Sequence, residues 1–107
     1  MIKQLNEKNY NKYIKDNSNA IMIFTAKWCK PCAKIYPIME ELSSYNKNID
    51  FYVVDIDESK ALMEFFEIRT LPSCSVIKNG IIYKIISNLN EMEMGKMKEM
   101  IDYCYSV

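Results

Sequence analysis

The chain has 107 residues, 50% of them hydrophobic, which is enough for one domain to bury its own core without disulfide staples. Its 14 basic and 14 acidic residues cancel, and no run of like charges indicates binding to nucleic acid or to a membrane surface. The N-terminal residues lack the apolar stretch of a signal peptide, and no apolar run is long enough to span a bilayer. If the chain is complete, we expect one monomeric, cytoplasmic domain over residues 1–107.

Strand and helix patterns alternate along the first two thirds of the chain. Apolar runs rich in β-forming residues predict strands buried on both faces, and apolar residues three and four apart predict helices. A short strand is expected at 2–4, followed by a helix that has Leu5 on its apolar face and Asn6 as its N-cap and that ends within 16–19. A strand at 20–26 then leads to a helix that begins at about Lys30 and that Pro37 should kink. The last two elements of this part are a strand at 49–57 and a helix whose apolar face is Leu62, Phe65 and Phe66.

The last third of the sequence predicts a hairpin and a final helix. Asn79-Gly80 lies between two strand-like runs, 73–78 and 81–86, which is a strong hairpin signal. Residues 90 to about 103 are expected to be helical, with Asn90 as the N-cap and a core face at the end of the chain that comprises Met97, Met100, Ile101 and Cys104. Strands that alternate with helices pair in parallel, and the hairpin adds an antiparallel edge. We therefore expect an α/β fold whose mixed sheet of four to five strands is covered on both faces by four helices.

Cys29 and Cys32 lie three positions apart, where the strand at 20–26 ends and a helix begins. Two sulfurs at this spacing on the first helical turn can bond, so the pair can cycle between dithiol and disulfide. Unpaired backbone N–H groups and the positive end of the helix dipole favour the thiolate of Cys29, which is therefore the expected nucleophile. Lys30 adds positive charge and Pro31 fixes the backbone between the sulfurs. Cys32, one turn into the helix, is expected to resolve the mixed disulfide.

Other interpretations of the cysteines remain open. Cys74 and Cys104 could complete a zinc site with the pair, although the chain has no histidine and no second C-x-x-C. Their positions on a strand and on a helix face favour two buried, small apolar side chains, and the methionines at 92–100 favour packing over a copper site. Alternatively, the chain could be a protein-interaction module in which the cysteines matter little. We expect neither a metal nor a cofactor.

The sequence "WCKPC" resembles the W-C-x-P-C centre of thioredoxins, and the resemblance covers nearly the whole chain. "KIYPIMEEL" resembles the kinked helix after that centre, "VVDIDE" the third strand and its turn, and "IRTLPSCSVIKNG" the segment from the cis-proline to the last hairpin. The resemblance implies the thioredoxin fold. It also implies a thiol–disulfide oxidoreductase that reduces disulfide-containing proteins and is itself recycled by a thioredoxin reductase or another dithiol.

The same resemblance implies a substrate groove beside the cysteine pair. The Leu71-Pro72 bond should be cis and packed against Cys29 and Cys32, which is a specific expectation because cis X-Pro bonds are uncommon. In the family, the backbone just before this proline pairs with an extended stretch of substrate, a role that falls to Leu71 here. The apolar rim of the groove would be formed by Trp28, Pro72 and Leu89.

Several positions depart from the family pattern. Thioredoxins commonly carry a buried aspartate six residues before the first cysteine and a lysine paired with it, and here these positions are Ile23 and Val53. The aspartate is thought to take the proton from the resolving cysteine, so we hypothesise that mixed disulfides on this protein resolve slowly. Lys30 replaces the usual glycine between the cysteines, which should shift redox poise or partner choice. Asn88 replaces a glycine beside the groove and should narrow it.

Overall fold

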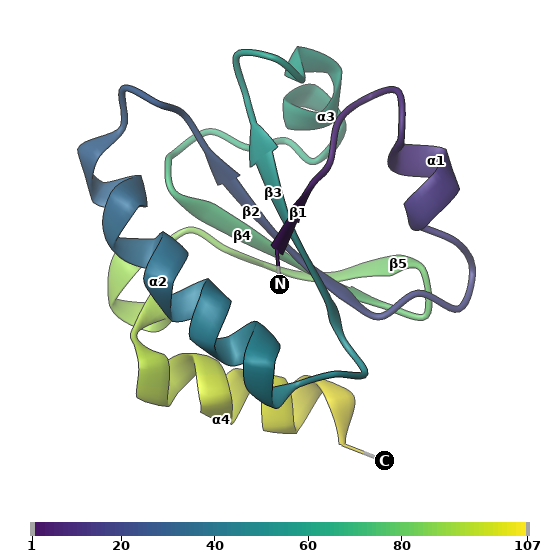
Figure 1. Cartoon of the computed structure of the whole chain (residues 1–107), viewed down its shortest axis with the longest axis vertical. Coiled ribbons are helices and arrows are strands. Elements are labelled where there is room, and N and C mark those ends of the chain that lie inside the picture. The colour runs from purple at the N-terminus through teal and green to yellow at the C-terminus, as the bar shows by residue number, and fades with distance from the viewer. Residues whose placement is uncertain (1, 107) are drawn as a thin grey trace.

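A five-stranded mixed sheet forms the centre of the computed structural model, which describes residues 2–106 (Figure 1). The strands are β1 (Ile2–Gln4), β2 (Ala20–Thr25), β3 (Asp50–Asp55), β4 (Ser73–Lys78) and β5 (Ile81–Ile86). They are arranged in the order β1-β3-β2-β4-β5. β3 runs parallel to β1 and β2, whereas β4 runs antiparallel to β2 and β5. The parallel strands and the antiparallel hairpin edge are as predicted, although β2 and β3 are slightly shorter than expected.

Helices cover both faces of this sheet. They are α1 (Tyr10–Tyr13), α2 (Lys30–Tyr45), α3 (Lys60–Phe65), the 3-10 helix η1 (Leu89–Met92) and α4 (Met94–Tyr105). α2 and α4 pack on one face, and α1 and α3 pack on the other (Figure 1). None of these helices in the described part of the chain is long and apolar enough to cross a membrane. The predicted α/β fold, with four α-helices around a mixed sheet, is confirmed.

The central strand β2 is buried on both faces because its alternate side chains enter two different cores. Met22 and Phe24 belong to the core beneath α1 and α3, whereas Ile21 and Ile23 belong to the core beneath α2 and α4. Each residue of the segment 20–24 is at most 2% exposed. Both packed layers therefore fix the strand that leads directly to the cysteine pair.

The hairpin between β4 and β5 turns at Asn79 and Gly80, as predicted. Their φ angles of 53° and 79° are both left-handed, which is the conformation that a two-residue hairpin turn requires. The turn is also tied to the segment before β2, because Gly80 N donates to Ser18 O at 2.8 Å and Asn79 N donates to Asn19 Oδ1 at 3.0 Å.

The predicted first helix is wrong in its start. Leu5 is not part of a helix, because its N–H donates to Val53 O at 2.9 Å and so continues the pairing of β1 with β3. Asn6 does accept backbone N–H groups through its side chain, from Lys8 and Asn9, but these belong to a turn before the helix. The helix itself is the single turn of α1.

The predicted last helix is also wrong in its start. Asn90 does not cap α4; its N–H donates to Asn88 Oδ1 at 2.9 Å inside η1, and Glu93 is extended between η1 and α4. Met92 and Met97 are both fully buried, yet residues five apart on one continuous α-helix would point about 140° away from each other. The break at Glu93 allows both methionines to enter the core.

The predicted apolar face of α3 is only partly correct. Leu62 and Phe66 are buried, but Phe65 is 64% exposed. Its ring meets Phe66 and Tyr10 edge-on, with centroids 5.3 Å and 6.3 Å apart, at the rim of the core. A helix this short buries one row of side chains, and Phe65 lies beside that row. Similarly, Met100 on α4 is only half-buried, in contrast to Met97, Ile101 and Cys104.

Candidate active site

Cys29 and Cys32 form a disulfide at the N-terminus of α2, with their Cα atoms 5.4 Å apart. Cys29 is the N-cap residue of this helix and has extended backbone angles, and Pro31 follows in the first turn. The unpaired N–H groups and the positive dipole of the helix therefore lie at the sulfur of Cys29, and they stabilise a thiolate there. Cys29 is 8% exposed and Cys32 is 3% exposed, so the outer sulfur is the more accessible one.

Trp28 stands on the surface next to this disulfide and is 67% exposed. Its Nε1 donates to Asp57 Oδ2 at 2.9 Å, which connects the segment after β2 with the turn after β3. An indole buried for packing alone would not be exposed to this extent. Trp28 is therefore a surface residue, and its role on the rim of a substrate groove stays a prediction.

A hollow of about 530 Å³, which we call the tryptophan hollow, opens beside Cys29. It is lined by Trp28, Cys29, Lys30, Pro31, Ile56, Met63, Arg69 and Leu71. The Leu71-Pro72 bond is cis, as predicted, and Leu71 packs against the same core cluster that contains Cys29 and Cys32. Pro72 is buried directly before β4. Leu71 therefore lines the same hollow as Cys29.

A second hollow of about 200 Å³, the Ile23 hollow, borders both cysteines from the other side. It is lined by Ile23, Thr25, Ala26, Lys27, Cys29, Cys32, Ala33, Tyr36 and Val53. Ile23 and Val53 thus stand beside Cys32, and among the described residues no carboxylate lines this hollow. Burial and the nearby Glu40 carboxylate raise the pKa of Tyr36, so its hydroxyl stays protonated at neutral pH and supplies no base.

Two of the sequence predictions concern the start of η1, at Asn88 and Leu89. Leu89 is 42% exposed and lines neither hollow around Cys29, so its place on the groove rim stays a prediction. The side chain of Asn88 accepts the N–H of Asn90 and so caps η1. The side-chain amide of Asn88 is therefore fixed by a hydrogen bond to a residue two positions further along the chain.

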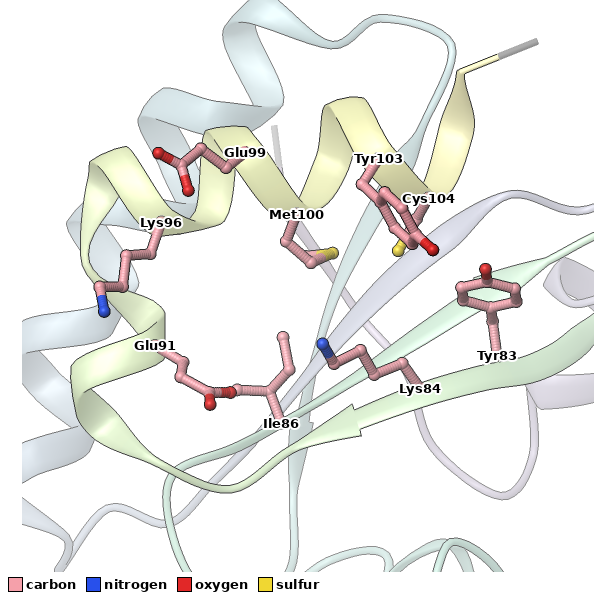
Figure 2. A pocket seen from close by; sticks show the side chains of 9 residues that line it. All are labelled: Tyr83, Lys84, Ile86, Glu91, Lys96, Glu99, Met100, Tyr103 and Cys104. Carbon is pink, nitrogen blue, oxygen red and sulfur yellow. The ribbon is translucent and has the colours of Figure 1, made fainter.

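The other two cysteines, Cys74 and Cys104, are free and almost completely buried. Burial raises the pKa of the Cys74 thiol to about 12, and burial also raises the pKa of Cys104, although Lys84 and Lys78 oppose that shift. Cys104 borders a hollow of about 370 Å³ between β5 and α4, which shares no lining residue with the hollows around Cys29 (Figure 2). Within residues 2–106, no group of three or more acidic or cysteine side chains could hold a metal ion.

Four residues around the tryptophan hollow were missed by the sequence analysis. Ile56, Met63 and Arg69 line it, and Asp57 holds Trp28. Arg69 lies two positions before Leu71, so its closeness to the cis bond was a usable signal. The other three come from the turn after β3 and from α3, and only the folded chain brings them to Cys29.

Sequence comparison shows that this chain is similar to thioredoxins. The family model described as Thioredoxin matches residues 1–102. Thioredoxin-1 of Caenorhabditis elegans is 33% identical over 104 residues, covering 88% of this chain and 90% of that protein. Thioredoxin H5 of Arabidopsis thaliana is 31% identical over 97 residues, covering 87% of this chain and 76% of that protein.

Solved structures that superpose on this chain include thioredoxins as well. The structure of mitochondrial thioredoxin 3 from Saccharomyces cerevisiae, in its oxidised form, superposes with a TM-score of 0.77 at 27% identity and covers 91% of this chain and 94% of that one. The thioredoxin of Malassezia sympodialis superposes with a TM-score of 0.83 at 23% identity, over 96% of this chain and 90% of that one, and it shares the fold.

Proposed function

The chain belongs to the thioredoxin family and is a thiol–disulfide oxidoreductase, and from this premise we propose that Cys29 is its nucleophile and Cys32 its resolving thiol. The observation that carries the proposal is the disulfide between the N-cap residue of α2 and the cysteine one turn further on. The nucleophile must be the sulfur that a substrate can reach and that the helix favours as a thiolate, and Cys29 meets both conditions.

The proposed reaction begins with the reduced pair. The Cys29 thiolate attacks one sulfur of a substrate disulfide, which forms a mixed disulfide and releases the first substrate thiolate. Cys32 then loses its proton to solvent and attacks the Cys29 sulfur, which releases the second substrate thiolate and closes the disulfide between the two cysteines. Two electrons pass from the dithiol to the substrate, and no bound cofactor takes part in these steps.

The second step is the one that the Ile23 hollow affects. Because no carboxylate among the described residues lines this hollow, we infer that water takes the proton of Cys32. A positioned base contributes about a hundredfold or more to a proton transfer, so we infer that the mixed disulfide on Cys29 is long-lived.

Thioredoxins act on disulfide substrates and are reduced by partners such as a reductase, and this chain shares that activity. We further propose that a thioredoxin reductase recycles it, that it works as a monomer, and that it works in the cytoplasm. Turnover with a thioredoxin reductase and sedimentation of the purified protein test the first two proposals.

Trapping with a Cys32→Ser variant tests the assignment of roles. This variant should accumulate mixed disulfides on Cys29, whereas Cys29→Ser should capture nothing and lose disulfide reduction. Mass spectrometry of the captured species identifies both the modified cysteine and the substrate. Capture on Cys32 in place of Cys29 would reverse the roles. If Cys29→Ser retained both activity and partner capture, the protein would act through its surface as an interaction module.

A further inference from the structure

The charged side chains that line the two hollows around the cysteine pair are all positive. Lys27 lines the Ile23 hollow, and Lys30 and Arg69 line the tryptophan hollow. No described Asp or Glu lines either of these hollows. The whole chain has no net charge, so this positive character is a local property of the site and does not follow from the composition.

These three cations are available to a ligand. Lys27, Lys30 and Arg69 are exposed, and within the described residues none of them forms an ion pair. The carboxylate of Asp57 accepts the hydrogen bond of Trp28 and lines an adjoining hollow of about 470 Å³. Arg69 lies on the border between the two hollows, because it lines both.

The charge changes beyond that border. The adjoining hollow is lined by three carboxylates, Asp57, Glu64 and Glu67, with Lys60 and Arg69 among them. Among the described residues, the hollow that contains Cys29 is thus lined by two cations and no carboxylate, whereas the adjoining hollow is lined by three carboxylates. Lys30 and Arg69 thus lie in the hollow that also contains the reactive sulfur.

The uncharged part of the tryptophan hollow is apolar, since Trp28, Ile56, Met63 and Leu71 line it. An apolar floor with an ammonium and a guanidinium group at its edges fits a short segment that carries one apolar and one acidic side chain. We propose that the preferred substrates of Cys29 are protein disulfides with an acidic residue beside the attacked cysteine, which Lys30 and Arg69 bind. This inference rests on the proposed function, because it names the substrate class of the same site.

Matched peptides test the proposal. Three disulfide-bonded peptides differ only in the residue next to the attacked cysteine, which is Asp, Asn or Lys, and kcat/KM for their reduction is measured. Exposed charge pairs are weak, so we expect the Asp peptide to be reduced about three- to tenfold faster than the Lys peptide at low ionic strength. The ratio should fall below about twofold in 0.5 M salt, where the charges are screened.

Variants of the protein assign the preference to residues. Arg69→Gln should lower the Asp-to-Lys ratio, and Arg69→Glu should invert it. Lys84→Gln removes the same charge from the hollow between β5 and α4, and it should leave the ratio unchanged. Because the readout is a ratio between peptides, a general change in the reactivity of Cys29 does not affect it.

The outcomes separate this inference from the proposed function. If the wild-type protein reduces all three peptides at equal rates, the charge preference is wrong while the oxidoreductase mechanism stands. If it reduces none of them while Cys32→Ser traps nothing, the proposed function itself fails. A preference for Asp that survives both Arg69→Gln and Lys30→Gln would overturn the assignment to these side chains.

Discussion

Ile23 determines what Cys32 meets when it has to lose its proton. The side chain is 2% exposed and lines the same hollow as Cys32. We predict that Ile23→Asp speeds the resolution of the mixed disulfide about a hundredfold, because it supplies a base beside the thiol. Rapid mixing that separates the attack by Cys29 from the release of the second substrate thiolate measures this step.

A matched variant separates basicity from polarity at this position. Ile23→Asn has a similar shape and polarity to the aspartate but cannot take a proton, so it should not accelerate resolution. Ile23→Asp should also lower the free energy of unfolding by about 3 kcal/mol, because Val53 offers its charge no partner. Equal resolution rates in wild type and Ile23→Asp would show that water is already an adequate acceptor.

Two buried serines of β4 offer a second comparison at the scale of single residues. Ser75 Oγ has no hydrogen-bond partner among the described residues, whereas Ser73 Oγ donates to Thr70 O at 2.6 Å. Ser75→Ala should raise the free energy of unfolding by about 1 kcal/mol because it removes an unpaired buried hydroxyl. Ser73→Ala should lower the same quantity by about 1 kcal/mol. Urea titration checks both, and a destabilised Ser75→Ala would contradict the first.

At the scale of elements, the two glycines have opposite roles. A Cβ atom on Gly80 would lie 2.5 Å from Lys15 O and 2.8 Å from the Cα of Asp16, and φ there is +79°. Gly80→Ala should therefore lower the free energy of unfolding by about 2 kcal/mol. Gly95, on the first turn of α4, has nothing within 4 Å of such an atom.

The matched substitution Gly95→Ala should raise the free energy of unfolding by about 0.5 kcal/mol, because alanine loses less conformational entropy than glycine in a helix. Thermal melts of both variants give opposite shifts in Tm if this argument is correct. A Gly80→Ala variant as stable as wild type would mean that the segment at Lys15 and Asp16 moves away at little cost.

The elements also show which parts of the fold could be predicted from the sequence. β2 and β4 were predicted closely because burial on both faces leaves a continuous apolar run that is visible locally, whereas the mostly exposed β5 was predicted from the Asn79-Gly80 turn before it. The starts of α1 and α4 were missed because several asparagines compete as caps within a few residues. The sequence favours Asn6 and Asn90 as the caps. In the structure, hydrogen bonds to the side chains of Asn9 and Asn88 and the burial of Met92 determine where the helices begin.

At the scale of the whole molecule, one part of the site could be predicted from the sequence and another part could not. The cysteine pair was predictable because its geometry is contained in one helical turn, and the cis bond followed from the resemblance in sequence. The tryptophan hollow was not predictable from spacing, because residues from the turn after β3, from α3 and from the segment before β4 meet there only in the folded chain. The positive side chains around Cys29 could not be predicted for the same reason, because Arg69 is forty positions from this cysteine in the sequence and only the fold brings them together.

Buried phenol and thiol groups make the whole fold sensitive to alkali. Burial, with the Asp50 carboxylate and Tyr13 adding to it, raises the pKa of Tyr52 to about 12, and burial raises that of Cys74 to about 12 as well. In the unfolded chain a tyrosine ionises near pH 10. The folded state therefore retains protons that the unfolded state releases, so the free energy of unfolding falls as pH rises from about 9 towards 12.

Tyr52→Phe isolates one of these groups. Phenylalanine retains the ring that packs at 5.9 Å from Tyr13 but has no proton to lose. Between pH 8 and pH 11 the wild type should lose about 1 kcal/mol more of its free energy of unfolding than this variant does. Urea titrations of both proteins at each pH give the difference, in which the contributions of the other tyrosines and of the free thiols cancel. Equal losses in the two proteins would mean that Tyr52 ionises at the same pH in the folded and unfolded states, so that its burial leaves its proton unaffected.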